Sequence, residues 1–297
     1  NKELIKYELN KMIHKVSLLY KAEANTKLVV SEIHIWDSEI DDPYKGTIEI
    51  SKLLRILRTN TQEINVFKKN HDVYMYLPVK KFSGAGGLAS GQGNVSPWGG
   101  LQTIAHEIGH NFSSPHTQSC SWENGPLDYC YPAEGSCYEN SLENIEGTVM
   151  SYCSIRKLTF HPEVRNILNA YANQNLDFVK TIPEVPQLDS LVINTFNIPF
   201  VSFSPTFEAS EYIYEISQTP DFQNILESDT IPFSSIYFKD YSKFTRYSIR
   251  VKAFNQFGTS DWSNTLEVIN ESKILSVPIP ASTFDRKYLD FATLYSN

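Results

Sequence analysis

The chain has 297 residues, of which 41% are hydrophobic and 20% charged, and its formal net charge is −8. This hydrophobic content is enough to fill protein cores, and the length predicts two domains. Lysine and arginine are dispersed and the net charge is negative, which argues against nucleic acid or an anionic membrane as a partner. The sequence has no apolar run long enough to span a bilayer, and its first residues are polar and helical, unlike a signal peptide or an anchor.

The first part of the chain alternates helical and strand patterns. Residues 1–20 and 47–59 carry apolar side chains at steps of three and four, which predicts two amphipathic helices. Residues 27–36 and 72–77 are rich in apolar and β-branched side chains and are predicted to be strands. The order of these elements predicts an α/β fold.

Two glycine-rich segments follow, residues 84–90 and 91–100. The second has neither a phosphate-loop lysine nor dinucleotide-binding spacing, and it is predicted to be a loop. From its composition alone, the first segment, residues 84–90, is also predicted to be a flexible loop.

The run from His106 to His116 predicts a metal site. His106 and His110 are four residues apart, so on a helix their imidazoles face one space, and His116 follows where the chain has turned away. Three histidines around zinc leave the fourth position for water, and Glu107 stands where a general base is needed. The same spacing also occurs on ordinary amphipathic helices, as a polar stripe.

A second segment favours the metal site. Residues 147–153, Gly-Thr-Val-Met-Ser-Tyr-Cys, resemble the methionine-containing turn beneath the zinc of metzincin metallopeptidases. Met150 by itself would be interpreted as a core filler. The second motif histidine is followed by Asn and Phe and then by a third histidine. This sequence is most similar to the reprolysin (adamalysin-like) branch of the clan, which includes secreted bacterial members.

The resemblance implies roles for individual residues. The zinc ligands would be His106, His110 and His116, the catalytic acid/base Glu107 and the turn methionine Met150. Tyr152 matches the position where astacins and serralysins carry a tyrosine that approaches the zinc or stabilises the tetrahedral intermediate. The alternative for Tyr152 is a tyrosine packed beside Cys153.

The sequence departs from the family pattern at two places. Ser113 stands where the family has glycine, at a bend whose backbone conformation costs other residues about 1 kcal/mol. Metzincins also place a strand before the first helix, inside the sheet, and we expect it to have been removed or to lie outside this chain.

The resemblance gives residues 84–90 a second interpretation, because metzincins place the sheet edge that lines the cleft there. Such an edge can bind an extended peptide as an added strand, which predicts an endopeptidase. The edge residues would be Gly86, Gly87, Leu88 and Ala89.

The four cysteines lie between the zinc motif and the end of the methionine turn, at positions Cys120, Cys130, Cys137 and Cys153. An even, local set predicts two disulfides and therefore an oxidising compartment, secreted or at the cell surface. A cysteine zinc site is the alternative, but no Cys-x-x-Cys pair occurs. Three pairings are open, and a bridge from Cys153 to Cys120 or Cys130 would clamp the methionine turn.

The acidic residues around Asp128, Glu134 and Glu139 form no recognisable calcium loop, so bound calcium has no support from the sequence.

After the turn, residues 162–171 are predicted to form a closing helix, and two prolines mark a linker at 182–187. Short alternating strands then run through residues 188–272. The pattern over 247–258 resembles the end of a fibronectin type III domain. Residues 273–297 are interpreted as a further linker, a tail or a terminal strand.

These patterns predict an α/β (α+β) metzincin domain, residues 1–181, with a mixed twisted sheet and a zinc-binding helix, followed by an all-β fibronectin type III-like sandwich. The predicted function is a secreted, monomeric endopeptidase with one catalytic zinc and a protein or peptide substrate. The alternatives are a non-catalytic adhesin or glycan-binding protein that retains the metzincin shell, and a peptidase restricted to glycoproteins.

Overall fold

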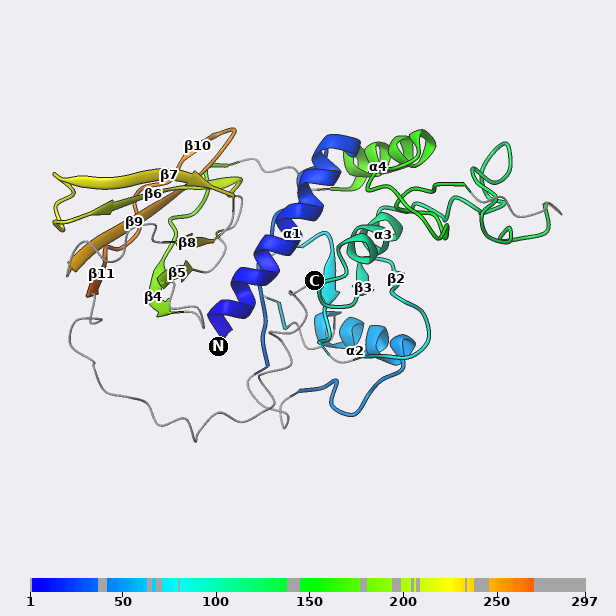
Figure 1. Cartoon of the computed structure of the whole chain (residues 1–297), viewed down its shortest axis with the longest axis horizontal. Helices are drawn as coiled ribbons and strands as arrows, with labels where there is room; N and C mark the ends of the chain where they lie inside the picture. Colours follow the sequence, from blue (N-terminus) through cyan, green and yellow to red (C-terminus); the bar gives the residue numbers. More distant parts are fainter. Residues whose placement is uncertain are drawn as a thin grey trace.

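The computed structural model describes most of the chain up to residue 269. The described residues are 2–36, 42–62, 66–67, 71–79, 81–137, 145–176, 181–193, 199–203, 206, 209–232, 234–237 and 246–269. An α/β part and a β-sandwich lie on either side of a long N-terminal helix (Figure 1). The predicted tail, residues 273–297, lies outside the described residues.

The first helix, α1 (Lys2–Ala24), confirms the prediction for residues 1–20. It is helical because its apolar residues recur on one side, and Ile13, Val16 and Tyr20 are buried in the core of the α/β part. There α1 packs against α3 (Leu101–Asn111) and the closing helix α4 (Pro162–Asn175).

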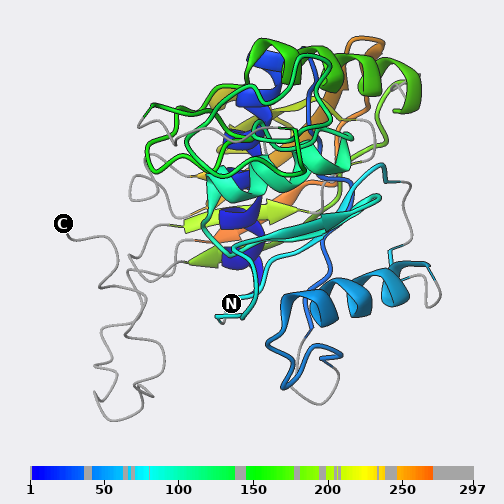
Figure 2. The same cartoon turned by 90° about the vertical axis from the view of Figure 1, so that its right-hand side faces the viewer.

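A small mixed sheet lies between two helices. Its strands, in the spatial order β1-β3-β2, are β1 (Tyr74–Tyr76), β3 (Gly93–Val95) and β2 (Leu88–Ser90). Strand β1 runs parallel to β3, whereas β2 runs antiparallel and forms an edge. The second helix, α2 (Ile50–Gln62), packs on one side of the sheet and α3 on the other (Figure 2).

The predictions for 47–59 and 72–77 are therefore confirmed, whereas two others are wrong. Residues 91–100 were expected to form a loop, yet Gly93–Val95 is the central strand. Gly93 serves close packing there, because a Cβ at this position would lie 2.6 Å from Cε2 of Tyr74.

The predicted strand at 27–36 is also not formed. The segment is extended, but it pairs with none of the described strands. Its backbone instead bonds to a side chain of α1: Leu28 N donates to Ser17 Oγ at 2.9 Å, and Ser17 Oγ donates to Leu28 O at 3.0 Å.

The closing helix α4 confirms the prediction for 162–171. Pro162 occupies its first turn, and His161 caps it by accepting a bond from Glu163 N at its Nδ1, at 3.3 Å. Its buried face, Val164 and Leu168, completes the core shared with α1 and α3.

The second part of the chain forms two sheets around a separate core. One sheet has the order β4-β5-β8, from β4 (Leu188–Ile193), β5 (Pro199–Phe203) and β8 (Ser235–Tyr237). The other has the order β10-β9-β6-β7, with β11 also paired to β9, from β6 (Glu211–Ser217), β7 (Ile225–Ile231), β9 (Arg246–Asn255), β10 (Gly258–Thr259) and β11 (Leu266–Ile269). Alternate side chains of β6, Tyr212, Tyr214 and Ile216, point into that core.

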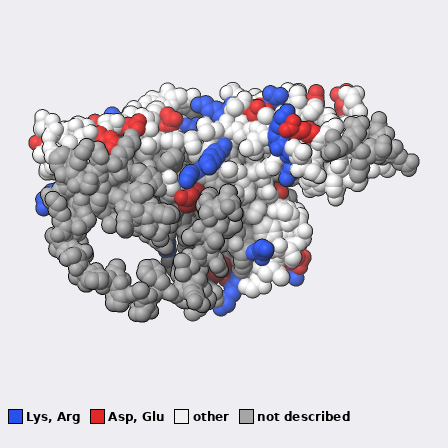
Figure 3. Space-filling model, in the orientation of Figure 1, with Lys and Arg blue, Asp and Glu red and all other residues white. Residues whose placement is uncertain are grey.

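Among the described residues, the helices are too short or too polar to cross a bilayer. On the face drawn in Figure 3, lysine and arginine lie interspersed with aspartate and glutamate, in agreement with the dispersed charge of the sequence.

Helix α1 also contacts the sandwich. The ring of Tyr7 lies 5.9 Å from that of Phe200, and Asn10 Nδ2 donates to Ser234 Oγ at 2.9 Å. Because side chains alternate along β5, Val201 and Phe203 face the sandwich core while Phe200 faces α1, where it is fully buried. The helix is thus shared by both parts of the chain.

We expect Tyr7→Ala to lower the free energy of unfolding by about 2–4 kcal/mol, because it removes the ring that covers Phe200. Leu18→Ala, on an exposed position of the same helix, is the control and should change stability by less than about 0.5 kcal/mol. Urea unfolding of the full chain measures both. Equal effects of the two variants would show that this contact contributes nothing.

Candidate metal centre

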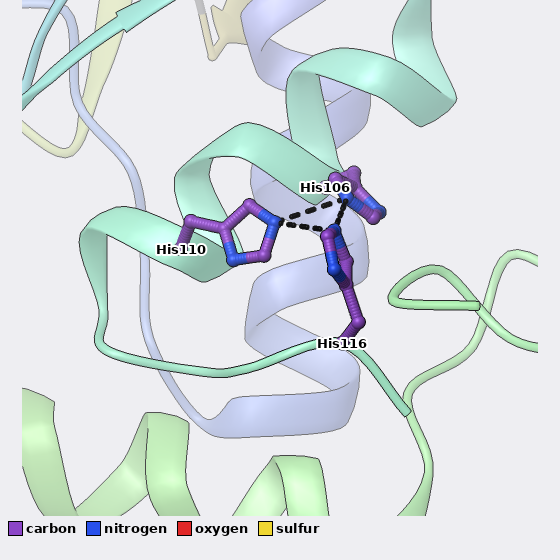
Figure 4. Close-up of side chains that lie close together, drawn as sticks. All are labelled: His106, His110 and His116. Atoms are coloured by element: carbon purple, nitrogen blue, oxygen red, sulfur yellow. Dashed lines mark hydrogen bonds between the residues drawn. The ribbon is translucent and has the colours of Figure 1, made fainter. Parts of the chain in front are cut away.

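Three imidazoles converge at the C-terminal end of α3 (Figure 4). The Nε2 atoms of His106 and His110 are 3.1 Å apart, those of His110 and His116 are 3.0 Å apart, and those of His116 and His106 are 3.1 Å apart. The first two residues are four apart on the helix, and the third approaches from the segment after it. The structure brings together all three histidines expected from the sequence.

The other nitrogen of each ring is held by an acceptor. The Nδ1 atom of His106 lies 2.7 Å from Val149 O, and that of His110 lies 2.7 Å from Ser114 O. The Nδ1 atom of His116 lies 2.7 Å from Oε1 of Glu134.

Because carbonyl and carboxylate oxygens only accept, the proton of each neutral ring lies on Nδ1 and the Nε2 lone pair is free. Burial lowers the pKa of His106 to about 3 and also lowers that of His110, so these rings are neutral. Three lone pairs that face one another this closely suit a cation, and three imidazoles suit zinc.

The turn after α3 brings His116 to the other two histidines. Ser113 has a φ of +66°, so it occupies the left-handed conformation that favours the glycine expected there. Ser114 N donates to Gly109 O at 3.0 Å, which closes the helix and reverses the chain. The departure at Ser113 therefore leaves the geometry of the turn intact.

The segment around Met150 lies beneath the histidines. Met150 is fully buried, and its sulfur packs so close to Gly109 that a Cβ there would lie 2.5 Å away. Thr117, next to His116, donates from its backbone N to Met150 O at 3.1 Å. The turn thus contacts both α3 and the segment that carries the third histidine.

The cysteines form the two predicted disulfides, and the pairing that the sequence left open is Cys120–Cys137 and Cys130–Cys153. The second ties the cysteine-rich loop to the end of the methionine turn. Beside it, the buried carboxylate of Asp128 accepts a bond from Ser151 Oγ at 2.7 Å. Asp128, Cys130 and Cys153 lie close enough for a metal, but the disulfide removes both thiolates as ligands.

Glu107 is buried between α3 and the segment before β2. A Cβ at Gly87 would overlap Oε1 of Glu107 and lie 2.7 Å from Cγ2 of Thr103, so a larger residue there would displace these side chains. Burial raises the pKa of Glu107 to about 8.

The ring of Tyr152 lies against the histidines and not only beside Cys153. Its centroid is 4.4 Å from that of His116 and 5.8 Å from that of His106. Tyr131 packs edge-on against it at 5.1 Å. Burial, followed by the charges of two nearby glutamates, raises the pKa of Tyr152, so its hydroxyl remains a donor.

The four predicted edge residues lie on or next to β2. Leu88 and Ala89 pair with Val95 and Asn94 of β3, and the other edge of β2 pairs with no described strand. A Cβ at Gly86 would meet nothing within 4 Å, in contrast to Gly87.

The sequence profile of metallo-peptidase family M12 matches residues 2–161, more than half of the chain. The chain belongs to this family.

No curated protein matches the M12 chain. Several solved fibronectin type III structures are similar to about 30% of it. "Structure of FN3tt mut" is 20% identical, covers 30% of this chain and 97% of that one, and has a TM-score of 0.24. A Fn3-like protein from Clostridium thermocellum is 13% identical, with coverages of 30% and 92% and a TM-score of 0.24. The sixth fibronectin type III domain of human fibronectin type III domain containing protein 3 is 15% identical, with coverages of 32% and 90% and a TM-score of 0.26.

Sequence reasoning missed two acidic residues of the M12 site, Asp128 and Glu134, as partners of its turn and its third histidine. Their position between cysteines that bridge back toward the site was the available signal.

We expect Ser113→Val to lower the free energy of unfolding by about 1–2 kcal/mol, because a β-branched side chain fits the left-handed conformation poorly. Ser113→Gly should cause no loss, because glycine adopts a positive φ readily. Denaturant unfolding of the zinc-free M12 protein measures both. A glycine variant less stable than the valine variant would contradict the left-handed turn.

Proposed function

We propose that the chain is a secreted zinc endopeptidase of the metzincin type and its reprolysin-like branch, with His106, His110 and His116 as the zinc ligands. One observation carries the proposal: three Nε2 atoms converge within 3.0–3.1 Å while each Nδ1 is held by an acceptor. The membership of family M12 supports it.

Burial alone favours the protonated form of Glu107, but a cation held by the neighbouring imidazoles would favour the carboxylate. In the proposed reaction, this carboxylate takes a proton from the water that attacks the substrate carbonyl and passes it to the departing amine. His106, His110 and His116 would hold a zinc ion, which would supply Lewis acidity toward the substrate carbonyl and the attacking water. The close approach of Gly87 to the Glu107 carboxylate limits where that carboxylate can lie.

Two further parts of the site have proposed roles. Tyr152, with its ring beside His116, would donate its hydroxyl to the oxyanion that develops on the carbonyl. The free edge of β2 would bind the substrate backbone as an added strand, which suits an endopeptidase.

The two disulfides support an oxidising, extracellular compartment. We propose that the chain consists of a peptidase domain (1–181), a linker (182–187) and a fibronectin type III-like domain (188–272). The second domain is assigned a spacer or substrate-docking role, and a monomer is the proposed active form.

Purified full-length protein loaded with zinc should cleave members of a mixed library of peptides, proteins and glycoproteins. Glu107→Gln should lose activity by about 10²-fold or more, because the general base is gone, while it still binds one zinc. Mass spectrometry of the products measures cleavage, and a chelator is the second control. Zinc binding without cleavage would overturn the peptidase and favour a binding protein, whereas cleavage of the glycoproteins alone would favour the restricted peptidase.

Gly87→Ala should lower kcat/KM by about 10²-fold with zinc affinity unchanged, because the added methyl displaces the Glu107 carboxylate. Gly86→Ala is the matched control, since its methyl would meet nothing within 4 Å. Steady-state kinetics on one cleaved peptide compares them. Wild-type activity in Gly87→Ala would mean that the carboxylate is not held there.

A further inference from the structure

We propose that Glu134 is a positioning residue for the third ligand, and that the Cys120–Cys137 disulfide holds it in place for that purpose. The inference rests on the proposed zinc site. The Nδ1 atom of His116 donates to Oε1 of Glu134 at 2.7 Å, whereas the other two ligands donate to backbone carbonyls.

His116 is the ligand that most needs such a partner. His106 and His110 are fixed by α3, but His116 stands in irregular chain after the turn. Its backbone is held by Trp122, whose Nε1 donates to His116 O at 2.8 Å. That bond does not set the direction of the imidazole nitrogens, and the carboxylate of Glu134 fixes the orientation and tautomer of the ring.

Glu134 is itself held firmly although its side chain is partly exposed. Its backbone N donates to Gln118 O at 3.0 Å, and Cys120 N donates to Glu134 O at 2.9 Å. Gln118 also donates from Nε2 to the same Oε1 atom at 3.2 Å. These bonds tie Glu134 to the segment that directly follows His116.

The disulfide and a glycine complete the arrangement. Cys120–Cys137 closes the loop that carries Glu134. Gly135 has a φ of +118°, and a Cβ there would lie 2.9 Å from Cβ and 3.0 Å from Sγ of Cys120. Glycine therefore lets the loop pass against the disulfide directly after Glu134.

A carboxylate on the far nitrogen makes an imidazole a stronger metal ligand, and loss of such partners lowers metal affinity by about 10–100-fold. We expect Glu134→Ala to lower the zinc affinity of the full chain by about 10–100-fold. Competition with a chromophoric chelator measures this affinity. Glu134→Gln should recover part of the affinity, because its carbonyl oxygen still accepts the Nδ1 proton. Glu123→Gln, an exposed glutamate of the same loop, should match the wild type.

Thermal unfolding of the zinc-free proteins separates this role from a structural one, and Glu134→Gln, which keeps an acceptor for Gln118 Nε2, should unfold with the wild type. Removing the disulfide in Cys120→Ser/Cys137→Ser should also lower the zinc affinity. Adding Glu134→Ala to that variant should lower the affinity further, but by less than the product of the two separate fold-changes. Zinc affinity of Glu134→Ala within twofold of the wild type would overturn the inference. Failure of the wild type itself to bind zinc would overturn the proposed function, and this inference with it.

Discussion

The structure of the site depends on one electrostatic constraint: three imidazole lone pairs must face one another at 3.0–3.1 Å. A neutral imidazole offers its Nε2 lone pair only when its proton lies on Nδ1, and an acceptor beside Nδ1 holds the proton there. Those acceptors come from three separate segments, the turn at Ser114, the methionine turn at Val149 and the cysteine-rich loop at Glu134. The folding of each segment is therefore part of building the site.

Helix α3 can serve this site because glycine lets neighbours approach it closely on two sides. Gly109, within the helix, admits the sulfur of Met150 from below. Gly87, in the segment before the edge strand, admits the carboxylate of Glu107. The same helix thus carries two of the proposed ligands and the proposed base, each held against a different part of the chain.

The sequence predicted the parts of this fold that short-range periodicity determines. Helix α1 and the spacing of His106 and His110 follow from repeats of three and four residues, and Met150 from a local motif. The central strand was missed because Gly93 and its neighbours have the composition of a loop, while the close packing against Tyr74 that requires glycine is a long-range contact. Glu134 was missed as a partner of His116 for the same reason, since a disulfide brings it there.

Helix α1 has a consequence for the order in which the chain becomes compact. Its side toward α3 is covered by residues of the first part of the chain, but its contact with the sandwich waits for a partner 224 residues further on, at Ser234. During synthesis the peptidase part can close around α1 while the surface at Tyr7 is still open to water. Synthesis of β5 and of the residues up to Ser234 then covers that surface, so the burial of the first helix is finished by residues of the second part of the chain.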